Sequence, residues 1–342
     1  MSTFALALTG ALVFAAIGLP LPFLFGPLIF CLVAALAGAQ LQNMGVLGTY
    51  MRTVLGVAIG ASIQPEVVER LPQMAASVAL IPIYIGLIGL IGVPFFTRIC
   101  GFDRATAYYA SMPGGLQDMV LFGAEAGGDI RALSLIHATR VLVIVILTPI
   151  IMVTSFGAEF SQPIGAPAAS LPPLELAIMA ASGLIGWKVA ARLRLFGASI
   201  LGPLILTAVL SLAGVIEHRP PAEAILAAQL FIGLTIGVHY TGITLRELRH
   251  DVLAGVAFMV LLALLAAAFT EIVYLLGLAP PVDAFLAFAP GGQAEMVILA
   301  ILAGADLGFV VVHHLVRVMA VILFAPLAAR LVGITRDRQP PS

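Results

Sequence analysis

The fold is decided by a heptapeptide that occurs twice, as Pro-Gly-Gly-Leu-Gln-Asp-Met at residues 113–119 and as Pro-Gly-Gly-Gln-Ala-Glu-Met at residues 290–296. The two copies are 177 residues apart (290 minus 113), and this offset continues beyond the motif. The matched pairs that follow are Gly127 with Gly304, Asp129 with Asp306, His137 with His314, Arg140 with Arg317 and Pro149 with Pro326. Upstream, an offset of 176 aligns Gly-Pro-Leu at 26–28 with 202–204. The chain is therefore predicted to be an internal duplication, a common plan among membrane transporters, whose sites lie at the repeat interface.

Composition places the chain in a lipid bilayer. Hydrophobic residues make up 61% of it and charged residues 10%, against roughly 25% charged residues in a typical soluble domain. Apolar runs long enough to cross a hydrocarbon core of about 30 Å recur along the whole chain. The net charge of −1 offers no basic surface for nucleic acid. The two cysteines, Cys31 and Cys100, lack the spacing of a disulfide framework or a zinc site.

Each half predicts five membrane spans, with the motif region between the fourth and the fifth. The expected spans lie at about 4–19, 23–39, 46–63, 74–96 and 132–154, then at about 174–191, 199–216, 224–241, 252–276 and 308–330, with motif regions at 105–128 and 282–304. The expected fold is an all-α polytopic membrane protein of two inverted repeats, each with five transmembrane helices and one re-entrant, broken helix that carries the Pro-Gly-Gly motif. The expected divisions are a first repeat at 1–155, an extracytoplasmic linker at 156–172, a second repeat at 173–335 and a cytoplasmic tail at 336–342.

Positive charge indicates whether each motif region spans or re-enters, because short cytoplasmic loops carry an excess of Lys and Arg. If the motif regions re-enter, twelve of fourteen loop cations are cytoplasmic, and only Arg70 and Arg219 lie outside. If the motif regions span, the same fourteen residues divide seven to seven. The sequence therefore favours re-entrant motif segments, inverted halves and cytoplasmic N- and C-termini.

The Pro-Gly-Gly sequence is predicted to interrupt a helix inside the membrane. Proline is tolerated at the start of a helix, and glycine permits a sharp turn. The start of the next half-helix presents free N–H groups and the positive end of a dipole, which favour an anion. Irregular backbone at membrane depth must be buried or must line a wet cavity, so the motif marks the transport pathway. The candidate binding residues here are Pro113, Gly114, Gly115, Gln117, Asp118, Pro290, Gly291, Gly292, Gln293 and Glu295.

An acid follows the second glycine by three residues in both copies, as Asp118 and as Glu295. One interpretation is a group that faces the cavity and couples transport to H⁺ or Na⁺. The other is an acid that caps the first helical turn and complements its dipole. Repetition of the acid at membrane depth favours the first interpretation.

A His-x-x-Arg pair recurs in the fifth span of each half, as His137 with Arg140 and as His314 with Arg317. The i, i+3 spacing puts both side chains on one helix face. If Arg131 marks the cytoplasmic boundary, Arg140 lies about 13 Å deeper, close to the bilayer midplane, where an arginine must be paired or wet. Two roles stay open: the arginines bind an anionic substrate group, or they pair with acids and hold the re-entrant segments in place. Asp129 and Asp306 are candidate supporting acids.

These motifs resemble those of the AbrB-type membrane proteins of bacteria, a family defined by internal duplication. The resemblance implies a multi-pass protein of the bacterial inner membrane that acts as a transporter. The arrangement of spans is also similar to that of elevator-type carriers. The expected function is a secondary active transporter of a small organic anion by alternating access, coupled to H⁺ or Na⁺ and without another cofactor. The outer spans are expected to form a scaffold or a homodimer surface.

Two alternatives belong to other classes of protein. A membrane metalloenzyme, such as a monooxygenase, needs a cluster of His or carboxylate ligands, and the adjacent His313 and His314 with the distant His137 fall short of one. A regulatory membrane protein would need a partner, because the sequence has no sizeable soluble output domain. An enzyme and a metal site are therefore not expected.

Overall fold

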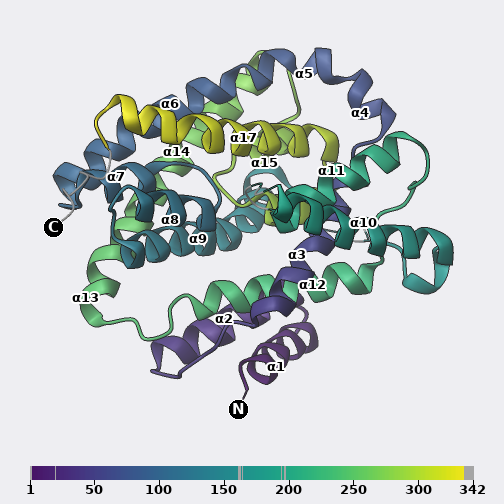
Figure 1. The fold of residues 1–342 in the computed structure, drawn as a ribbon, viewed down its shortest axis with the longest axis horizontal. Coiled ribbons are helices and arrows are strands. Elements are labelled where there is room, and N and C mark those ends of the chain that lie inside the picture. The colour runs from purple at the N-terminus through teal and green to yellow at the C-terminus, as the bar shows by residue number, and fades with distance from the viewer. Residues whose placement is uncertain are drawn as a thin grey trace. The chain divides into compact units, whose positions relative to one another are not determined.

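The computed structural model describes residues 2–19, 21–160, 163, 165–193, 195 and 198–334, and the expected tail at 336–342 lies outside these residues. Within the described ranges all regular structure is helical (Figure 1). The helices of the first half are α1 (Thr3–Ala16), α2 (Pro22–Leu36), α3 (Gly45–Gly60), α4 (Pro65–Glu69), α5 (Leu71–Val78), α6 (Leu80–Pro94), the π-helical η1 (Phe95–Ile99), α7 (Arg104–Ser111), α8 (Leu116–Glu125) and α9 (Ile130–Phe156).

The remaining helices belong to the second half. Its helices are the short 3₁₀ η2 (Ala168–Ser170), α10 (Pro173–Arg192), α11 (Ala198–Leu212), α12 (Ala222–Val238), α13 (Leu245–Glu247), the π-helical η3 (Leu248–Val252), α14 (Leu253–Leu275), α15 (Pro281–Phe288), α16 (Gln293–Ala303) and α17 (Leu307–Leu331). An apolar helix stands at each position where the hydropathy of the sequence predicts a span.

Five helical segments of the described chain are long and apolar enough to cross a bilayer. They are Leu71–Ile99, Ile130–Phe156, Pro173–Arg192, Leu245–Leu275 and Leu307–Leu331. Five shorter apolar helices, α1, α2, α3, α11 and α12, accompany them. A helix satisfies its backbone hydrogen bonds internally, which lipid requires of any spanning segment. The expected class of fold, a polytopic all-α membrane protein, is confirmed at this level.

The chain forms two compact units, and each unit draws on both sequence halves. The first unit contains Met1–Gln73, Pro149–Ile243 and Ala294–Val311. The second unit contains Met74–Thr148, Thr244–Gln293 and Val312–Ser342. The units therefore divide the chain along lines different from those of the sequence repeat.

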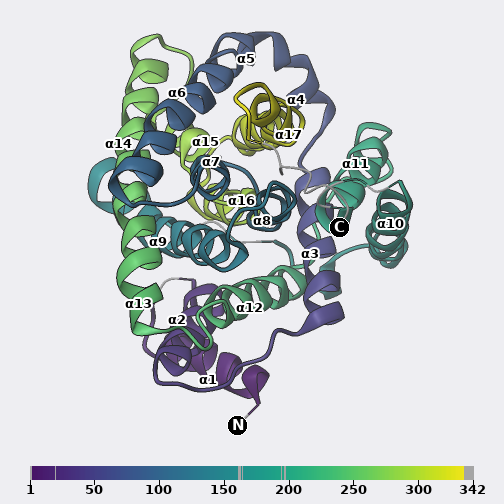
Figure 2. The same cartoon turned by 60° about the vertical axis from the view of Figure 1, so that its left-hand side comes forward.

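Glycine contacts bring helices of the first unit close together. On α1 and α2, a Cβ at Gly10 would collide with the backbone of Gly26, and the reverse also holds. Gly186 and Gly202 make the same reciprocal contact between α10 and α11, which lie side by side in Figure 2. Small residues permit this approach of helix backbones in a membrane protein. In both halves, a reciprocal glycine contact therefore lets the first helix pack closely on the second.

The third helix of each half packs on the second helix of the other half, also within the first unit. Gly56 of α3 lies against the carbonyl of Ile200 on α11. Gly233 of α12 lies against the carbonyl of Leu24 on α2, as the adjacent α2 and α12 of Figure 1 show. Each half thus contributes its third helix to the packing of the other half, so neither half forms the first unit alone.

The second unit contains α7, α8 and α15 of the broken helices, together with α6 and α14. α7 packs on α6 and α15 packs on α14. The buried Tyr84 hydroxyl of α6 donates a hydrogen bond to the carbonyl of Phe288 at the end of α15, at 2.8 Å. The Tyr108 hydroxyl of α7 donates to the carbonyl of Ala325 on α17, at 2.7 Å. Both bonds tie a segment of one half to a segment of the other.

Candidate functional site: two helix breaks held by arginine

The helix is interrupted at each copy of the motif. α7 ends at Ser111 and α8 begins at Leu116, and Met112 and Gly115 adopt extended backbone at this break. In the second copy, α15 ends at Phe288 and α16 begins at Gln293. A helix end leaves carbonyl groups without intrahelical partners, so each break needs donors from elsewhere.

Arg140 supplies donors at the first break. Its Nη1 donates to the carbonyl of Met112 at 2.9 Å, and its Nη2 donates to the carbonyl of Gly114 at 2.6 Å. The guanidinium fork suits this pair of acceptors on either side of Pro113, which has no N–H of its own. Arg140 is 5% exposed, so the interaction is sheltered from solvent.

Arg317 repeats the arrangement at the second break. Its Nη1 donates to the carbonyl of Ala289 at 2.7 Å, and its Nη2 donates to the carbonyl of Gly291 at 2.7 Å. Both acceptors follow those of Arg140 by 177 residues (289 minus 112 and 291 minus 114), the offset of the sequence repeat. The duplication in sequence therefore corresponds to a duplicated structural contact.

The two histidines bind the broken helices one turn earlier. The Nε2 of His137 lies 3.0 Å from the carbonyl of Tyr109, and the Nε2 of His314 lies 2.8 Å from the carbonyl of Leu286. A carbonyl only accepts, so each ring is assigned its proton on Nε2. The free Nδ1 of His314 then accepts a hydrogen bond from Arg317 Nη2 at 2.9 Å. With its proton on Nε2, each histidine ring stabilises the broken helix that it contacts.

The supporting acids Asp129 and Asp306 cap the helices that carry these pairs. Asp129 accepts hydrogen bonds from the N–H groups of Arg131 and Ala132 at the start of α9. Asp306 accepts from the N–H of Phe309 in α17 and forms an ion pair with Arg70 within the first unit. Within the second unit, Arg131 forms an ion pair with Glu247 at 2.8 Å.

Asp118 lies in the first turn of α8, outside the five long spans, and Gly115 caps this helix. A Cβ at Gly115 would lie 2.6 Å from the Asp118 Oδ2, so glycine leaves room for the carboxylate. Desolvation by burial raises the pKa of the Asp118 carboxyl to about 6. The backbone of Gln117 lies in the same turn, and its side chain is outside the described part of the chain.

The start of α16 carries two candidates that fall in different units. Glu295 is 8% exposed and belongs to the first unit. Gln293 belongs to the second unit, together with the break at Pro290, Gly291 and Gly292. Its buried Nε2 donor has no hydrogen-bond partner among the described residues, and neither has the buried Nε of Arg317. Two buried hydrogen-bond donors without an acceptor among the described residues therefore lie at the second break.

The structure adds polar contacts that sequence reasoning missed. The buried His313, to which the sequence gives no role, lies with its Nε2 2.9 Å from the hydroxyl of Ser77. Tyr84 binds the carbonyl that immediately precedes the second break. In the sequence, these contacts are marked only by a single Ser or Tyr within an apolar run.

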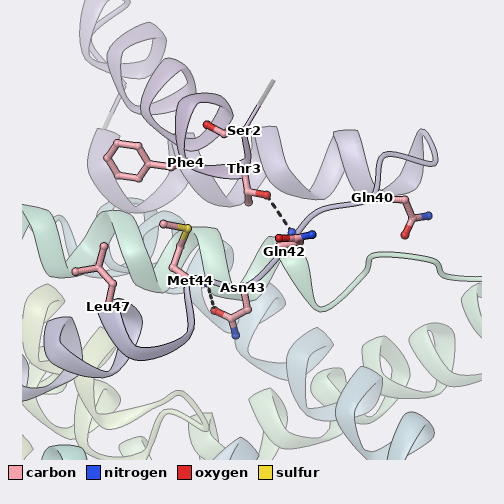
Figure 3. A pocket seen from close by; sticks show the side chains of 8 residues that line it. All are labelled: Ser2, Thr3, Phe4, Gln40, Gln42, Asn43, Met44 and Leu47. Carbon is pink, nitrogen blue, oxygen red and sulfur yellow. Dashed lines mark hydrogen bonds between the residues drawn. The ribbon is translucent and has the colours of Figure 1, made fainter.

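A recess of about 590 Å³ in the first unit is lined by neutral residues, and Figure 3 shows them. The lining residues are Ser2, Thr3, Phe4, Gln40, Gln42, Asn43, Met44 and Leu47. Thr3 accepts a hydrogen bond from the Gln42 N–H at 3.0 Å, and Asn43 accepts one from the Met44 N–H at 2.8 Å. Because its lining side chains are uncharged, this recess offers an anion less than the motif breaks do.

Fold and site together define a polytopic α-helical membrane protein with two equivalent, arginine-held helix breaks. The chain belongs to the family described as transition state regulatory protein AbrB, whose family model matches residues 3–333, and the expected family is confirmed. A Bacillus subtilis (strain 168) protein of uncharacterised function, YhjN, is 26% identical over 353 positions, covering 96% of this chain and 91% of its own. An Escherichia coli (strain K12) protein, provisionally named regulator AbrB, is 25% identical over 328 positions, covering 94% of this chain and 92% of its own.

Proposed function

We propose that the protein is a secondary active transporter of a small organic anion, built from two inverted repeats whose motif segments re-enter the membrane. The observation that carries this proposal is the pair of helix breaks, each held by an arginine and a histidine at the repeat offset. Secondary transporters bind substrates and ions at such broken helices, where free backbone groups line a cavity. A duplicated break in an apolar chain favours transport over a purely structural role.

The anionic substrate class is supported by the second break. Gln293 Nε2 and Arg317 Nε are buried donors that lack acceptors in the described part of the chain. An unserved buried donor costs about 1–3 kcal/mol, which a carboxylate ligand would recover.

Asp118 is the coupling group that we favour, with protons as the coupling ion. Burial raises the pKa of its carboxyl to about 6, and a carboxyl with a raised pKa is suited to take up and release a proton. Sodium coupling stays an alternative, and Glu295 is a separate candidate because it is also buried and repeats the position of Asp118.

Arg140 and Arg317 hold the breaks in this proposal. Both Nη groups of each arginine donate to carbonyls of a break, which uses part of the five N–H donors of the guanidinium before any substrate binds. Their contribution to transport is the shape of the break, and Arg317 retains its Nε for substrate.

The proposed setting is the bacterial inner membrane, with both termini cytoplasmic and the outer spans in a scaffold or homodimer surface. The charge distribution of the loops supports this orientation. Cysteines introduced at Ser2 and Ala169 of a cysteine-free variant test it. We expect an impermeant maleimide to label Ala169→Cys in intact cells and Ser2→Cys only after lysis.

The function is tested with full-length protein in detergent and in proteoliposomes. Acetate, lactate, succinate and citrate are compared at pH 5.5 and 7.5, with and without Na⁺, by thermal shift and then by uptake driven by a pH gradient. We expect one carboxylate to stabilise the protein and to be taken up, and Gln293→Ala to weaken both effects. Gln40→Ala, an exposed amide in the other unit, is the matched control. Failure of all four acids in both assays would overturn the proposal, and stabilisation by a transition metal alone would favour the metalloenzyme.

A further inference from the structure

A second recess, of about 580 Å³, opens in the first unit beside the linker between the two halves. It is formed by the end of α3, the linker, the loop before α12 and the start of α17. The lining residues include Ala166, Pro167, Leu171, Glu217, Arg219 and Leu307. The recess is separate in sequence from both motif breaks.

Hydrogen bonds fix the walls of this recess. Glu175, 8% exposed, accepts from the N–H groups of Glu217 and His218 at 2.8 Å each, and its other oxygen lies 2.8 Å from the His218 ring. The linker wall is held by a 2.9 Å bond from the Ala222 N–H to the Ala166 carbonyl. The walls are therefore preformed, which lowers the entropic cost of binding a ligand.

Arg219 brings to the recess a positive charge that forms no ion pair with an acid in the described part of the chain. Its Nη1 is buried and has no hydrogen-bond partner among the described residues, and no ion pair described for this part of the chain includes it. Glu175, the buried acid of this region, is already committed to the neighbouring loop. Desolvation by burial lowers the pKa of the Arg219 guanidinium.

The remaining lining selects among anions. Pro167, Leu171 and Leu307 offer apolar surface to a short hydrocarbon chain. Glu217 also lines the recess and carries a negative charge, so a second carboxylate on the ligand would meet repulsion. One cationic group, one acid and an apolar wall suit a ligand with a single carboxylate and a small apolar body.

We propose that this recess binds a small monocarboxylate, with its carboxylate on Arg219 and its hydrocarbon chain on the linker wall. The inference does not rest on the transport proposal, because the recess contains no residue of either motif. It adds a second anion site on the side of the protein that carries the linker.

Isothermal titration of the full-length protein in detergent, with butyrate and succinate as probes, tests this site. We expect saturable binding of butyrate, binding of succinate weaker by at least tenfold, and at least tenfold weaker butyrate binding in Arg219→Gln. Arg249→Gln, an exposed arginine of the other unit, should leave butyrate binding unchanged. Gln293→Ala should leave this site intact, which separates it from the second motif break.

A blocking variant keeps the test decisive if Arg219→Gln fails to fold. Ala166 is exposed on the linker wall, so Ala166→Trp fills the recess without removing a charge. We expect Ala166→Trp to elute as the parent protein does on size exclusion and to lose butyrate binding. Unchanged butyrate affinity in Ala166→Trp, or no saturable butyrate binding by the parent protein, would overturn the inference.

Discussion

At the scale of single residues, the two equivalent arginines act on the backbone. Each guanidinium donates to two carbonyls separated by one residue, at a point where helical hydrogen bonding has stopped. A lysine carries the same charge but only a single nitrogen, so it does not reproduce the planar fork. These contacts therefore require the planar shape of the guanidinium as well as its positive charge.

Arg317→Lys should therefore destabilise the protein. One of the carbonyls of Ala289 and Gly291 would lose its donor, at about 1–3 kcal/mol for a buried unsatisfied group. Arg140→Lys should have an effect of similar size because it breaks equivalent contacts. Chemical denaturation in detergent measures both, with Arg249→Lys as the exposed control. Loss of substrate binding without any loss of stability would contradict the holding role.

Asp118 predicts a pH dependence of stability. Its pKa in the folded protein, about 6, exceeds the usual 3.8, so the folded state binds more protons than the unfolded state between these values. Stability should fall as pH rises from about 4 through 6 and then level off. Asp118→Asn should remove this part of the pH dependence and should be more stable than the parent protein above pH 6. Melting curves of both proteins from pH 4 to 8 check this, and parallel curves would contradict it.

At the scale of helices, close backbone approach depends on glycines at the crossing points. Gly202 lies so near the backbone of Gly186 that a methyl group has no room. Gly86 of α6, by contrast, has no neighbouring atom within 4 Å of an added Cβ. Glycine therefore occupies a crowded helix crossing at position 202 and open space at position 86.

Gly202→Ala should destabilise the protein by about 1–3 kcal/mol or more, because α10 and α11 would be forced apart. Gly86→Ala should be neutral or stabilising by up to about 1 kcal/mol, since alanine is the better helix former. Thermal unfolding of the two variants side by side gives the comparison. Equal effects of the two substitutions would show that the crossing tolerates a side chain.

At the scale of the whole molecule, neither half is self-sufficient. α3 packs on α11 and α12 packs on α2 within the first unit, and Tyr84 and Tyr108 bind carbonyls of the other half within the second. Folding must therefore bring together segments that are far apart in sequence, which adds loop-closure entropy to its cost.

Residues 1–155 and 173–335, expressed as separate chains, should each fail to accumulate as stable protein. Co-expression of the two chains should restore a complex that co-purifies in detergent, because the exchanged helix contacts need no covalent link. Affinity purification through a tag on one half measures this recovery. A stable, monodisperse single half would contradict the interdependence.

Much of the helical architecture could be predicted from hydropathy, and the two breaks from Pro-Gly-Gly. The acceptors of Arg140 and Arg317 could not, because every residue has a carbonyl and no side-chain letter identifies which one is left unpaired. The pairing of Asp306 with Arg70 is equally hidden in the sequence, since the alternative that gave Asp306 a partner paired it with the midplane arginines. The exchanged packing depends on which glycine meets which backbone, and composition does not encode that choice.

The exchange of third helices has an evolutionary consequence. A single-repeat ancestor could make these contacts between two separate copies, each lending its third helix to the second helix of the other, before gene fusion joined them. In such a dimer, positions 70 and 247 would have held one amino acid. They now hold Arg and Glu, and each forms an ion pair with the opposite half. The two halves therefore carry opposite charges at this matched position.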